Sequence, residues 1–206
     1  MPVKEATRVM SDVDTLASED ALRAQMYRFL ARLLSAPADE ALLKSVSEME
    51  GDETGLGKAM LSFAKMARKI DLSHAEEEYH DLFIGVARGE LLPYSSYYLT
   101  GFLHEKPLSK LRNDMARLGI ARGADHKEPE DHIASLMDMM AGLITGEFGD
   151  PAPLAEQKTF FEAHISSWAS HFFADLEGAK SSVLYAALGS IGRSFMEIEA
   201  TAFSMS

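Results

Sequence analysis

The sequence predicts an all-α protein, a single bundle of about eight to ten helices that spans residues 1–206. Apolar residues recur at the i, i+3, i+4 spacing of an amphipathic helix along most of the chain, whereas alternating strand patterns are almost absent. Short segments that contain glycine and proline separate these periodic runs. The composition agrees with this fold class, because 206 residues with 47% hydrophobic side chains can bury a core without a metal or a disulfide.

Four helices are expected before residue 86. The first begins after Ser18, a residue type that caps helix N-termini, and ends at Pro37. Two short helices follow it. The capping-box pattern SHAE at 73–76 predicts the start of the fourth helix, and Gly85 its end. The apolar residues behind these four predictions are Leu22, Met26, Phe29, Leu30 and Leu33, then Leu42, Leu43, Val46 and Met49, then Leu56, Met60, Phe63 and Ala67, and finally Tyr79, Leu82 and Phe83.

Residues 85–107 differ from the segments around them, because they contain three glycines, two prolines, four leucines and three tyrosines. This composition has too many turn formers for a long helix and too many apolar residues for a solvated linker. Two interpretations stay open. The segment is either a packed loop that fills the side of the bundle, or an apolar groove lined by tyrosines, which combine a large contact area with a polar tip.

Four further helices are expected after residue 107. The first of them ends at Gly119, the next begins near Pro129, and the breaker GEFGDPAP at 146–153 precedes the last two. The connection at 119–127 is expected to act as a hinge between two helical halves. The apolar residues of the four helices are Leu108, Leu111, Met115 and Leu118, then Ile133, Leu136, Met137, Met140, Leu143 and Ile144, then Phe161, Ile165, Trp168 and Phe172, and finally Leu184, Leu188, Ile191, Phe195 and Ile198.

The stretch KEPEDHIASLM at 127–137 predicts a helix start with Glu128 as the N-cap and Pro129 at the first helical position. Glu130, Asp131 and His132 would then occupy the first turn. Acidic side chains there complement the helix dipole, by about 0.3–1 kcal/mol each. His132 gains nothing from this end of a helix, which favours the neutral imidazole, a form able both to donate and to accept a hydrogen bond. Helix capping therefore explains the acidic residues but not the histidine.

Several classes of catalyst find no support in the sequence. The chain has no cysteine, which excludes an iron–sulfur cluster and a thiol nucleophile, and it has neither a phosphate-binding loop nor a G-x-S-x-G turn. Asp131 and His132 would point about 100° apart on a helix, unlike paired zinc ligands. His164 and His171 are expected to be satisfied core or boundary residues. We expect no catalytic residue, no metal and no cofactor. A metal-dependent hydrolase built on Asp131 and His132 remains an alternative that elemental analysis would test.

The charge balance bears on partners and location. The chain has 32 acidic and 20 basic residues and a formal net charge of −12, which repels nucleic acid and anionic membranes and favours a basic partner. The first residues contain no apolar signal-peptide region. The longest uncharged and mostly apolar run, 181–192, is shorter than the roughly 20 residues that span a bilayer. We therefore expect no nucleic-acid binding, no membrane span and a cytoplasmic location.

Three motifs in order resemble the TorD/DmsD/NarJ family of cytoplasmic redox-enzyme maturation chaperones. The motifs are YHDLFIG at 79–85, PYSSYYLTG at 93–101 and EPEDHIASLM at 128–137. The segments at 107–120 and 164–176 are also similar to helices of the family, so the resemblance extends from about residue 20 to residue 200. Ser95 stands where one branch of the family often has glutamate, which leaves the identity of the client enzyme open.

The resemblance implies an all-helical chaperone rather than an enzyme. Such proteins bind the twin-arginine signal peptide and the apo-form of a molybdoenzyme catalytic subunit, and they delay its export until the molybdenum cofactor is inserted. The resemblance assigns signal-peptide binding to nine residues, and Glu128 is added because its carboxylate is complementary to the arginines of such a peptide. The ten residues are expected to converge in one apolar cleft with an acidic rim. The ten residues are Leu82, Phe83, Pro93, Tyr94, Ser96, Tyr98, Glu128, Asp131, His132 and Trp168.

Two points stay open at the level of the sequence. A generic helical adaptor that binds another amphipathic segment is the alternative function, and such an adaptor should be indifferent to an arginine pair in its ligand. Members of the family exchange helical halves, so a monomer and a domain-swapped dimer with its hinge at 119–127 are both compatible with the sequence.

Overall fold

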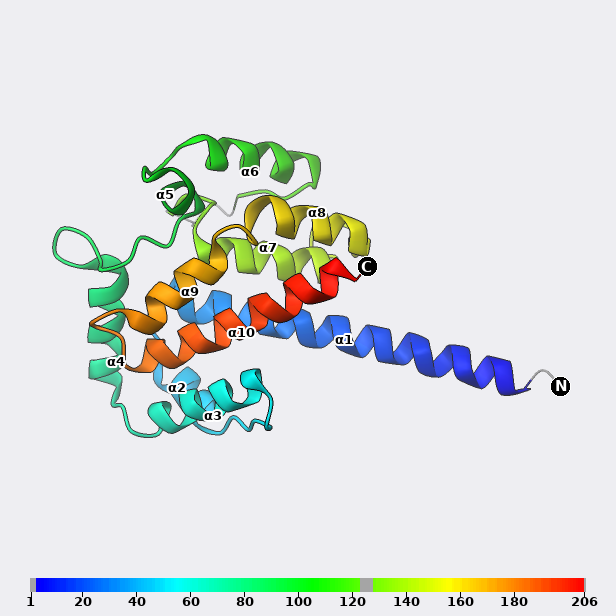
Figure 1. Ribbon diagram of the computed structural model, residues 1–206, viewed down its shortest axis with the longest axis horizontal. Coiled ribbons are helices and arrows are strands. Elements are labelled where there is room, and N and C mark those ends of the chain that lie inside the picture. The colour runs from blue at the N-terminus through cyan, green and yellow to red at the C-terminus, as the bar shows by residue number, and fades with distance from the viewer. Residues whose placement is uncertain (1–2, 123–127, 206) are drawn as a thin grey trace.

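The computed structural model describes residues 3–122 and 128–205, with side chains described from residue 19 onward. Within these ranges the chain forms ten α-helices and one π-helix, and its sole β-type pairing is an isolated bridge. The helices are α1 (Val3–Ser35), α2 (Glu40–Ser47), α3 (Gly55–Ala67), α4 (Leu72–Tyr79), the π-helix η1 (His80–Ile84), α5 (Ser95–Thr100), α6 (Lys106–Arg117), α7 (Ile133–Thr145), α8 (Leu154–His164), α9 (Ala169–Gly178) and α10 (Leu184–Ser204) (Figure 1). The prediction of an all-α bundle is confirmed.

Helix α7 is the most continuously buried element, and it packs along α1. Its predicted apolar face is confirmed, because Ile133, Leu136, Met137 and Met140 are completely buried. On another side of the bundle α10 packs against α9 and α3 (Figure 1). Gly189 allows the close approach of α10 to α9, since a Cβ atom there would lie 2.7 Å from the carbonyl oxygen of Phe173.

Two helix starts and one additional helix in the first half of the chain differ from the predictions. Helix α1 continues through Ser18, and α4 begins at Leu72 because Asp71, rather than a residue of the SHAE pattern, caps it by accepting a hydrogen bond from the His74 backbone N–H at 3.0 Å. The six-residue helix α5 lies within the segment 85–107, which had been expected to be irregular.

The helix predicted through Phe161 and Phe172 is two helices, α8 and α9, with a break at residues 165–168. No glycine or proline marks this break. The indole Nε1–H of Trp168 donates to the carbonyl oxygen of His164 at 2.8 Å and so satisfies an acceptor that the end of α8 leaves free. His164 is buried and its Nε2 lies 2.8 Å from Asp114 Oδ2, which confirms it as a satisfied boundary histidine, whereas the break leaves His171 exposed.

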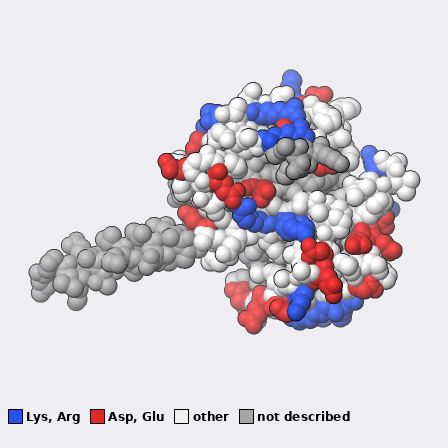
Figure 2. Space-filling view, turned by 180° about the vertical axis from the view of Figure 1, so that it is seen from behind, with Lys and Arg blue, Asp and Glu red and all other residues white. Residues whose placement is uncertain are grey.

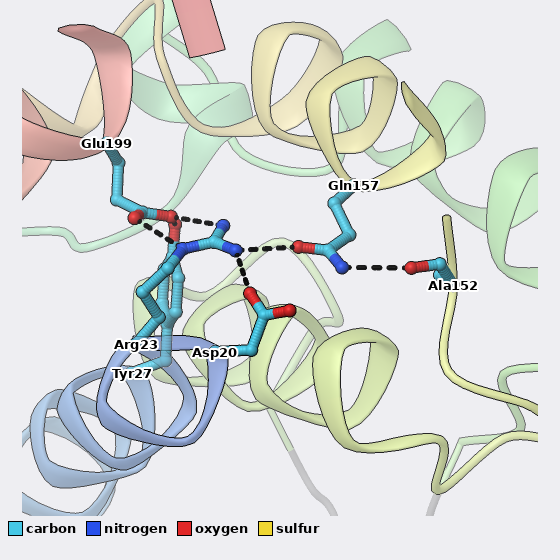
Figure 3. Close-up of polar contacts among 6 residues, drawn as sticks. All are labelled: Asp20, Arg23, Tyr27, Ala152, Gln157 and Glu199. Carbon is cyan, nitrogen blue, oxygen red and sulfur yellow. Dashed lines mark hydrogen bonds and ion pairs between the residues drawn. The ribbon is translucent and has the colours of Figure 1, made fainter. Parts of the chain in front are cut away.

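A buried polar cluster, which we call the Arg23 cluster, joins α1 to α8 and α10. It consists of Asp20, Arg23, Tyr27, Gln157 and Glu199 (Figure 3). The Arg23 guanidinium makes two hydrogen bonds to the Glu199 carboxylate, at 2.8 Å and 2.9 Å, and its third nitrogen donates to both Asp20 and Gln157. The Tyr27 hydroxyl donates to Glu199 at 2.9 Å. The cluster fixes the position of α1, because every donor nitrogen of the guanidinium has an acceptor on a defined helix.

Acidic and basic side chains are interspersed on the face seen in Figure 2, without a large area of one sign. The excess of acidic residues is therefore not concentrated on that face. No helix in the described part of the chain is long and apolar enough to cross a membrane. Of the predicted hinge, residues 123–127 lie outside the described residues; Gly119 has a positive φ of 71°, and Ile120 is buried.

Candidate functional site

A cleft of ≈ 750 Å³ lies between the C-terminal half of α1, the α4–η1 segment and the beginning of α7. Residues from α1, η1, the segment before α5 and the segment before α7 form its walls. The apolar lining residues used below are Ala31, Pro37, Phe83, Ile84 and Pro93, and the polar ones are Arg28, Arg32, Tyr94, Glu128, His132 and Asp138. A mostly apolar concavity with a few polar groups is the usual form of a binding site.

The π-helix η1 sends consecutive side chains to different places. Leu82 is completely buried in the core, whereas Phe83 is partly buried and lines the cleft. The Phe83 ring packs edge-on against Tyr79 and Tyr185, with centroids 5.0 Å and 5.7 Å away. These contacts hold the ring in one orientation at the wall of the cleft.

The segments before α5 and α7 are joined by backbone pairing. The Ser95 N–H donates to the Asp131 carbonyl at 3.0 Å, and the Ile133 N–H donates to the Pro93 carbonyl at 2.8 Å. The buried Asp131 carboxylate accepts a hydrogen bond from the Ser96 backbone N–H at 2.8 Å and therefore supports the first turn of α5. This pairing brings two motifs that are distant in sequence to the same side of the cleft.

His132 is the N-cap of α7, so the predicted helix start at Glu128 is wrong. The helix begins at Ile133, and the Ala134 backbone N–H donates to His132 Nδ1 at 3.1 Å. Residues 129–132 form a turn rather than the first turn of the helix, because the His132 N–H donates to the Pro129 carbonyl at 3.1 Å. The Asp131 carboxylate accepts a hydrogen bond from α5 instead of capping α7. Because the ring nitrogen Nδ1 caps the helix by accepting a hydrogen bond, a histidine is suitable at this position, which the helix-dipole argument did not explain.

The imidazole of His132 is neutral at ordinary pH. Burial lowers the pKa of His132 to about 4, against the opposing effect of Glu128 and Asp131. Because Nδ1 accepts the Ala134 N–H, the proton of the neutral ring resides on Nε2. Within the described part of the chain, no acceptor is hydrogen-bonded to this second nitrogen, and the residue lines the cleft. His132 is therefore a hydrogen-bond donor with a fixed ring orientation.

Tyr94 and Glu128 form the polar side of the cleft next to His132. The Tyr94 hydroxyl donates to the carboxylate of the exposed Glu128, and the Tyr94 ring packs edge-on to the His132 ring with centroids 5.1 Å apart. Burial, together with the hydrogen bond to Glu128, raises the pKa of Tyr94 well above its usual range. The tyrosine consequently stays a donor.

The rim of the cleft carries both signs of charge, whereas the sequence predicted an acidic rim. Arg28 pairs with Asp138 at 3.4 Å and also with Glu147, and Arg32 pairs with Asp39 at 2.7 Å. Glu130, one of the acidic residues expected at the rim, is instead largely buried against Arg112 at 2.8 Å. The pKa of Glu130 is lowered, because the bonds and charge of Arg112 outweigh the effect of burial.

The structure brings half of the ten predicted site residues together. Phe83, Pro93, Tyr94, Glu128 and His132 line the cleft. The other five do not: Leu82 and Trp168 are core residues, Ser96 and Asp131 are buried behind the cleft wall, and Tyr98 packs on Trp168 with its hydroxyl 2.8 Å from Asp175. These residues support the segments that form the wall.

The cleft also has lining residues that were not predicted from the sequence, among them Arg28, Arg32, Ile84 and Asp138. Asp138 had a usable signal, since it is the only charged residue in the otherwise apolar sequence of α7. The arginines had none, because surface positions of an amphipathic helix commonly carry charges. Among the described residues, no group of three or more histidine, aspartate and glutamate side chains is arranged to hold a metal.

Comparison with known proteins assigns the family. Residues 49–174 match the family described as nitrate reductase delta subunit. Two relatives named "Chaperone protein TorD" are each 28% identical to the chain: that of Aliivibrio fischeri over 73% of this chain and 80% of its own length, and that of Vibrio atlanticus over 86% and 92%.

A similar fold is also found among solved structures. The putative redox enzyme maturation protein from Archaeoglobus fulgidus aligns with a TM-score of 0.55 and 20% identity, over 85% of this chain and 93% of that one. With the family match covering more than half of the chain, these findings confirm the resemblance seen in the three motifs. The chain belongs to the TorD/DmsD/NarJ family and is a chaperone of molybdoenzyme maturation, not an enzyme.

Proposed function

We propose that this chaperone binds the twin-arginine signal peptide of a molybdoenzyme catalytic subunit in the cleft, and delays export of the apo-subunit until the molybdenum cofactor is inserted. The observation that carries the proposal is the convergence of Phe83, Pro93, Tyr94, Glu128 and His132 around one cavity. Binding would take place in the cytoplasm, before export. Because α1, η1, α5 and α7 all contribute to the cleft or its support, we propose that the whole chain acts as one chaperone domain.

The apolar part of the peptide would supply most of the affinity. A cavity of ≈ 750 Å³ accommodates several large side chains against Phe83, Pro93 and Ala31. Burial of three or four such side chains gives roughly 5–10 kcal/mol. Association and ordering cost at least about 4 kcal/mol. The remainder, at most about 6 kcal/mol, corresponds to a Kd of tens of micromolar or weaker, which suits a chaperone that must release its client.

The arginine pair would supply orientation. A smaller cavity of ≈ 130 Å³ adjoins the cleft, with which it shares Glu128, Ser135 and Asp138. Its other charged lining residues among those described are Glu130, Glu147 and Arg122, so carboxylates outnumber the one cation. Guanidinium groups of the peptide would lie at this acidic side, where exposed ion pairs contribute only about 0–1 kcal/mol each. The Nε2–H of His132 would donate to a backbone carbonyl of the peptide. Asp131, to which the family resemblance assigned peptide binding, is buried and bonded to Ser96, so the proposal gives it no contact with the peptide.

Calorimetric titration with synthetic peptides tests the proposal. We expect binding of a peptide that contains an arginine pair followed by an apolar run. Replacement of its leucines by serine should weaken affinity at least tenfold, whereas replacement of the arginines by glutamine should weaken it about two- to fivefold. If leucine replacement has no effect while added salt abolishes binding, the two contributions are assigned in the wrong order.

A generic adaptor is the second candidate function. A rim of mixed charge supports this function better than the acidic rim expected from the sequence would. Arg28 and Arg32 would accept acidic groups of a ligand as readily as Glu128 and Asp138 accept basic ones. A panel of amphipathic peptides without arginine pairs separates the two functions. Equal affinity for the whole panel would favour the adaptor.

A further inference from the structure

The loop at residues 85–89 carries an apolar side chain in an unusual setting. Val86 is fully exposed, with a relative accessibility of 105%, and the preceding Ile84 is 53% exposed and lines the cleft. Single exposed apolar residues are common on proteins and carry no conclusion alone. Three further features distinguish this loop: its closed base, its glycines and the π-helix that leads into it.

Hydrogen bonds close the base of the loop. The Glu90 N–H donates to the Asp81 carbonyl at 3.0 Å, and the Leu91 N–H donates to the Leu82 carbonyl at 2.8 Å. The Glu90 carboxylate in turn accepts hydrogen bonds from the backbone N–H groups of residues 180 and 181, at 2.7 Å and 3.0 Å. These last bonds lower the pKa of Glu90 and attach the loop to the connection between α9 and α10.

Two glycines fold the loop tightly onto η1. Gly85 has a positive φ of 60°, and a Cβ atom there would lie 2.0 Å from the Arg88 carbonyl oxygen. A Cβ atom on Gly89 would lie 2.5 Å from the Leu82 carbonyl oxygen. Because both contacts are with backbone atoms, no side chain fits at either position without moving the loop. The loop is thus preformed, and the position of Val86 is fixed by its backbone.

The π-helix sets the direction of the residues that precede the loop. π-helical turns are rare and occur frequently at functional sites. In η1 the turn leaves Leu82 in the core while Phe83 and Ile84 reach the cleft. Ile84 thus lies at the cleft wall, and Val86 follows it by two residues, so the loop that carries Val86 begins at the cleft.

We propose that Val86 and Ile84 form an additional apolar contact that selects the far end of the apolar run of the bound peptide. This inference rests on the proposed function and adds a direction to it. The carboxylates shared with the smaller cavity mark one side of the cleft, and neither Phe83 nor Ile84 lines that cavity. A peptide whose arginines lie near Glu128 and Asp138 therefore extends its apolar run toward η1 and Val86. A preformed contact of this kind loses little conformational freedom on binding, so its burial strengthens the complex.

The substitution Val86→Ser tests the energetic part of the proposal. We expect a three- to tenfold loss of affinity for the arginine-pair peptide and an unchanged melting temperature. Phe102→Ser is the control, because Phe102 is also a loop residue and is 70% exposed, but does not line the cleft. Wild-type affinity in Val86→Ser would overturn the inference and leave the proposed function standing, and so would an equal loss of affinity in Phe102→Ser. A wild-type protein that does not bind the peptide would overturn both.

The absence of cysteine in the chain permits a direct test of direction. Val86→Cys can be labelled at a single site with bimane, a fluorophore that tryptophan quenches at short range. A peptide with tryptophan at the end of its apolar run should quench the label more strongly than one with tryptophan beside the arginines. Equal quenching, or the reverse order, would overturn the proposed direction. The same label on Phe102→Cys should not respond to either peptide.

Discussion

Two neighbouring stretches of α1 use charged side chains in opposite ways. Arg23 lies in the Arg23 cluster with a side chain that is 18% exposed, opposite a Glu199 side chain that is 1% exposed. Arg28, little more than one turn later, is 39% exposed at the rim of the cleft and pairs with carboxylates that are more than half exposed. The first arginine is satisfied by groups of fixed position, whereas the partners of the second remain accessible to water and to a ligand.

The difference teaches which polar contacts stabilise this protein and which are available for binding. Removing one member of a buried, hydrogen-bonded ion pair leaves the other charge in the interior without compensation. At the exposed pair, water replaces a lost partner at little cost. Helix α1 is thus fixed by its contacts at residues 20–27, so that its next two turns can form one wall of an open cleft.

The largest effect is expected for Arg23→Met. The substitution leaves the Glu199 carboxylate buried without its guanidinium partner and should lower the free energy of unfolding by about 3–5 kcal/mol. Urea denaturation measures this change. The double variant Arg23→Met/Glu199→Met should recover part of the loss, because no unpaired charge remains. A loss below about 1 kcal/mol in the single variant would mean that the Arg23 cluster does not fix α1.

An intermediate effect is expected for His132→Asn, and it depends on pH. The folded protein keeps His132 neutral down to a pKa of about 4, whereas the unfolded imidazole binds its proton near 6.5. Between these values falling pH favours the unfolded chain, so wild type should lose stability from pH 6.5 to pH 4. Asparagine retains a capping acceptor but does not titrate. Between pH 6.5 and pH 4 the free energy of unfolding of the variant should therefore fall by about 2–3 kcal/mol less than that of wild type.

Denaturation curves at several pH values measure the difference between the two proteins. Burial also lowers the pKa of His164, which acts in the same direction, but that residue is present in both and cancels in the comparison. Parallel stability curves for wild type and His132→Asn would show that His132 is not the buried neutral donor of the cleft.

The smallest effect is expected for Arg28→Met, the same substitution as in the Arg23 cluster. The free energy of unfolding should change by less than about 1 kcal/mol, because Asp138 and Glu147 are exposed and become hydrated. Urea denaturation alongside Arg23→Met gives the direct comparison. Equal losses in the two variants would remove the distinction between the buried stretch of α1 at Arg23 and the exposed stretch at Arg28.

The sequence by itself determined the helical class and most helix faces. The apolar face of α7 and the glycine stops at Gly85 and Gly119 follow from local rules, namely side-chain periodicity and the positive φ that glycine adopts readily. The family was also readable from three short motifs. In the site, the motifs named Phe83 and His132 correctly as residues of one cleft, and they also included residues such as Leu82 that only support it.

Only the tertiary structure decided the features that depend on distant partners. Asp131 supports α5 rather than the rim, because the Ser96 N–H, 35 residues away, donates to its carboxylate. Helix α7 consequently starts at Ile133, with His132 as its N-cap. Arg23 meets Glu199 across 176 residues, a pairing that no local pattern marks. The physical reason is the same in each case: a helix pattern records which side chains avoid water, whereas the choice of partner for a buried polar group is made where separate segments meet.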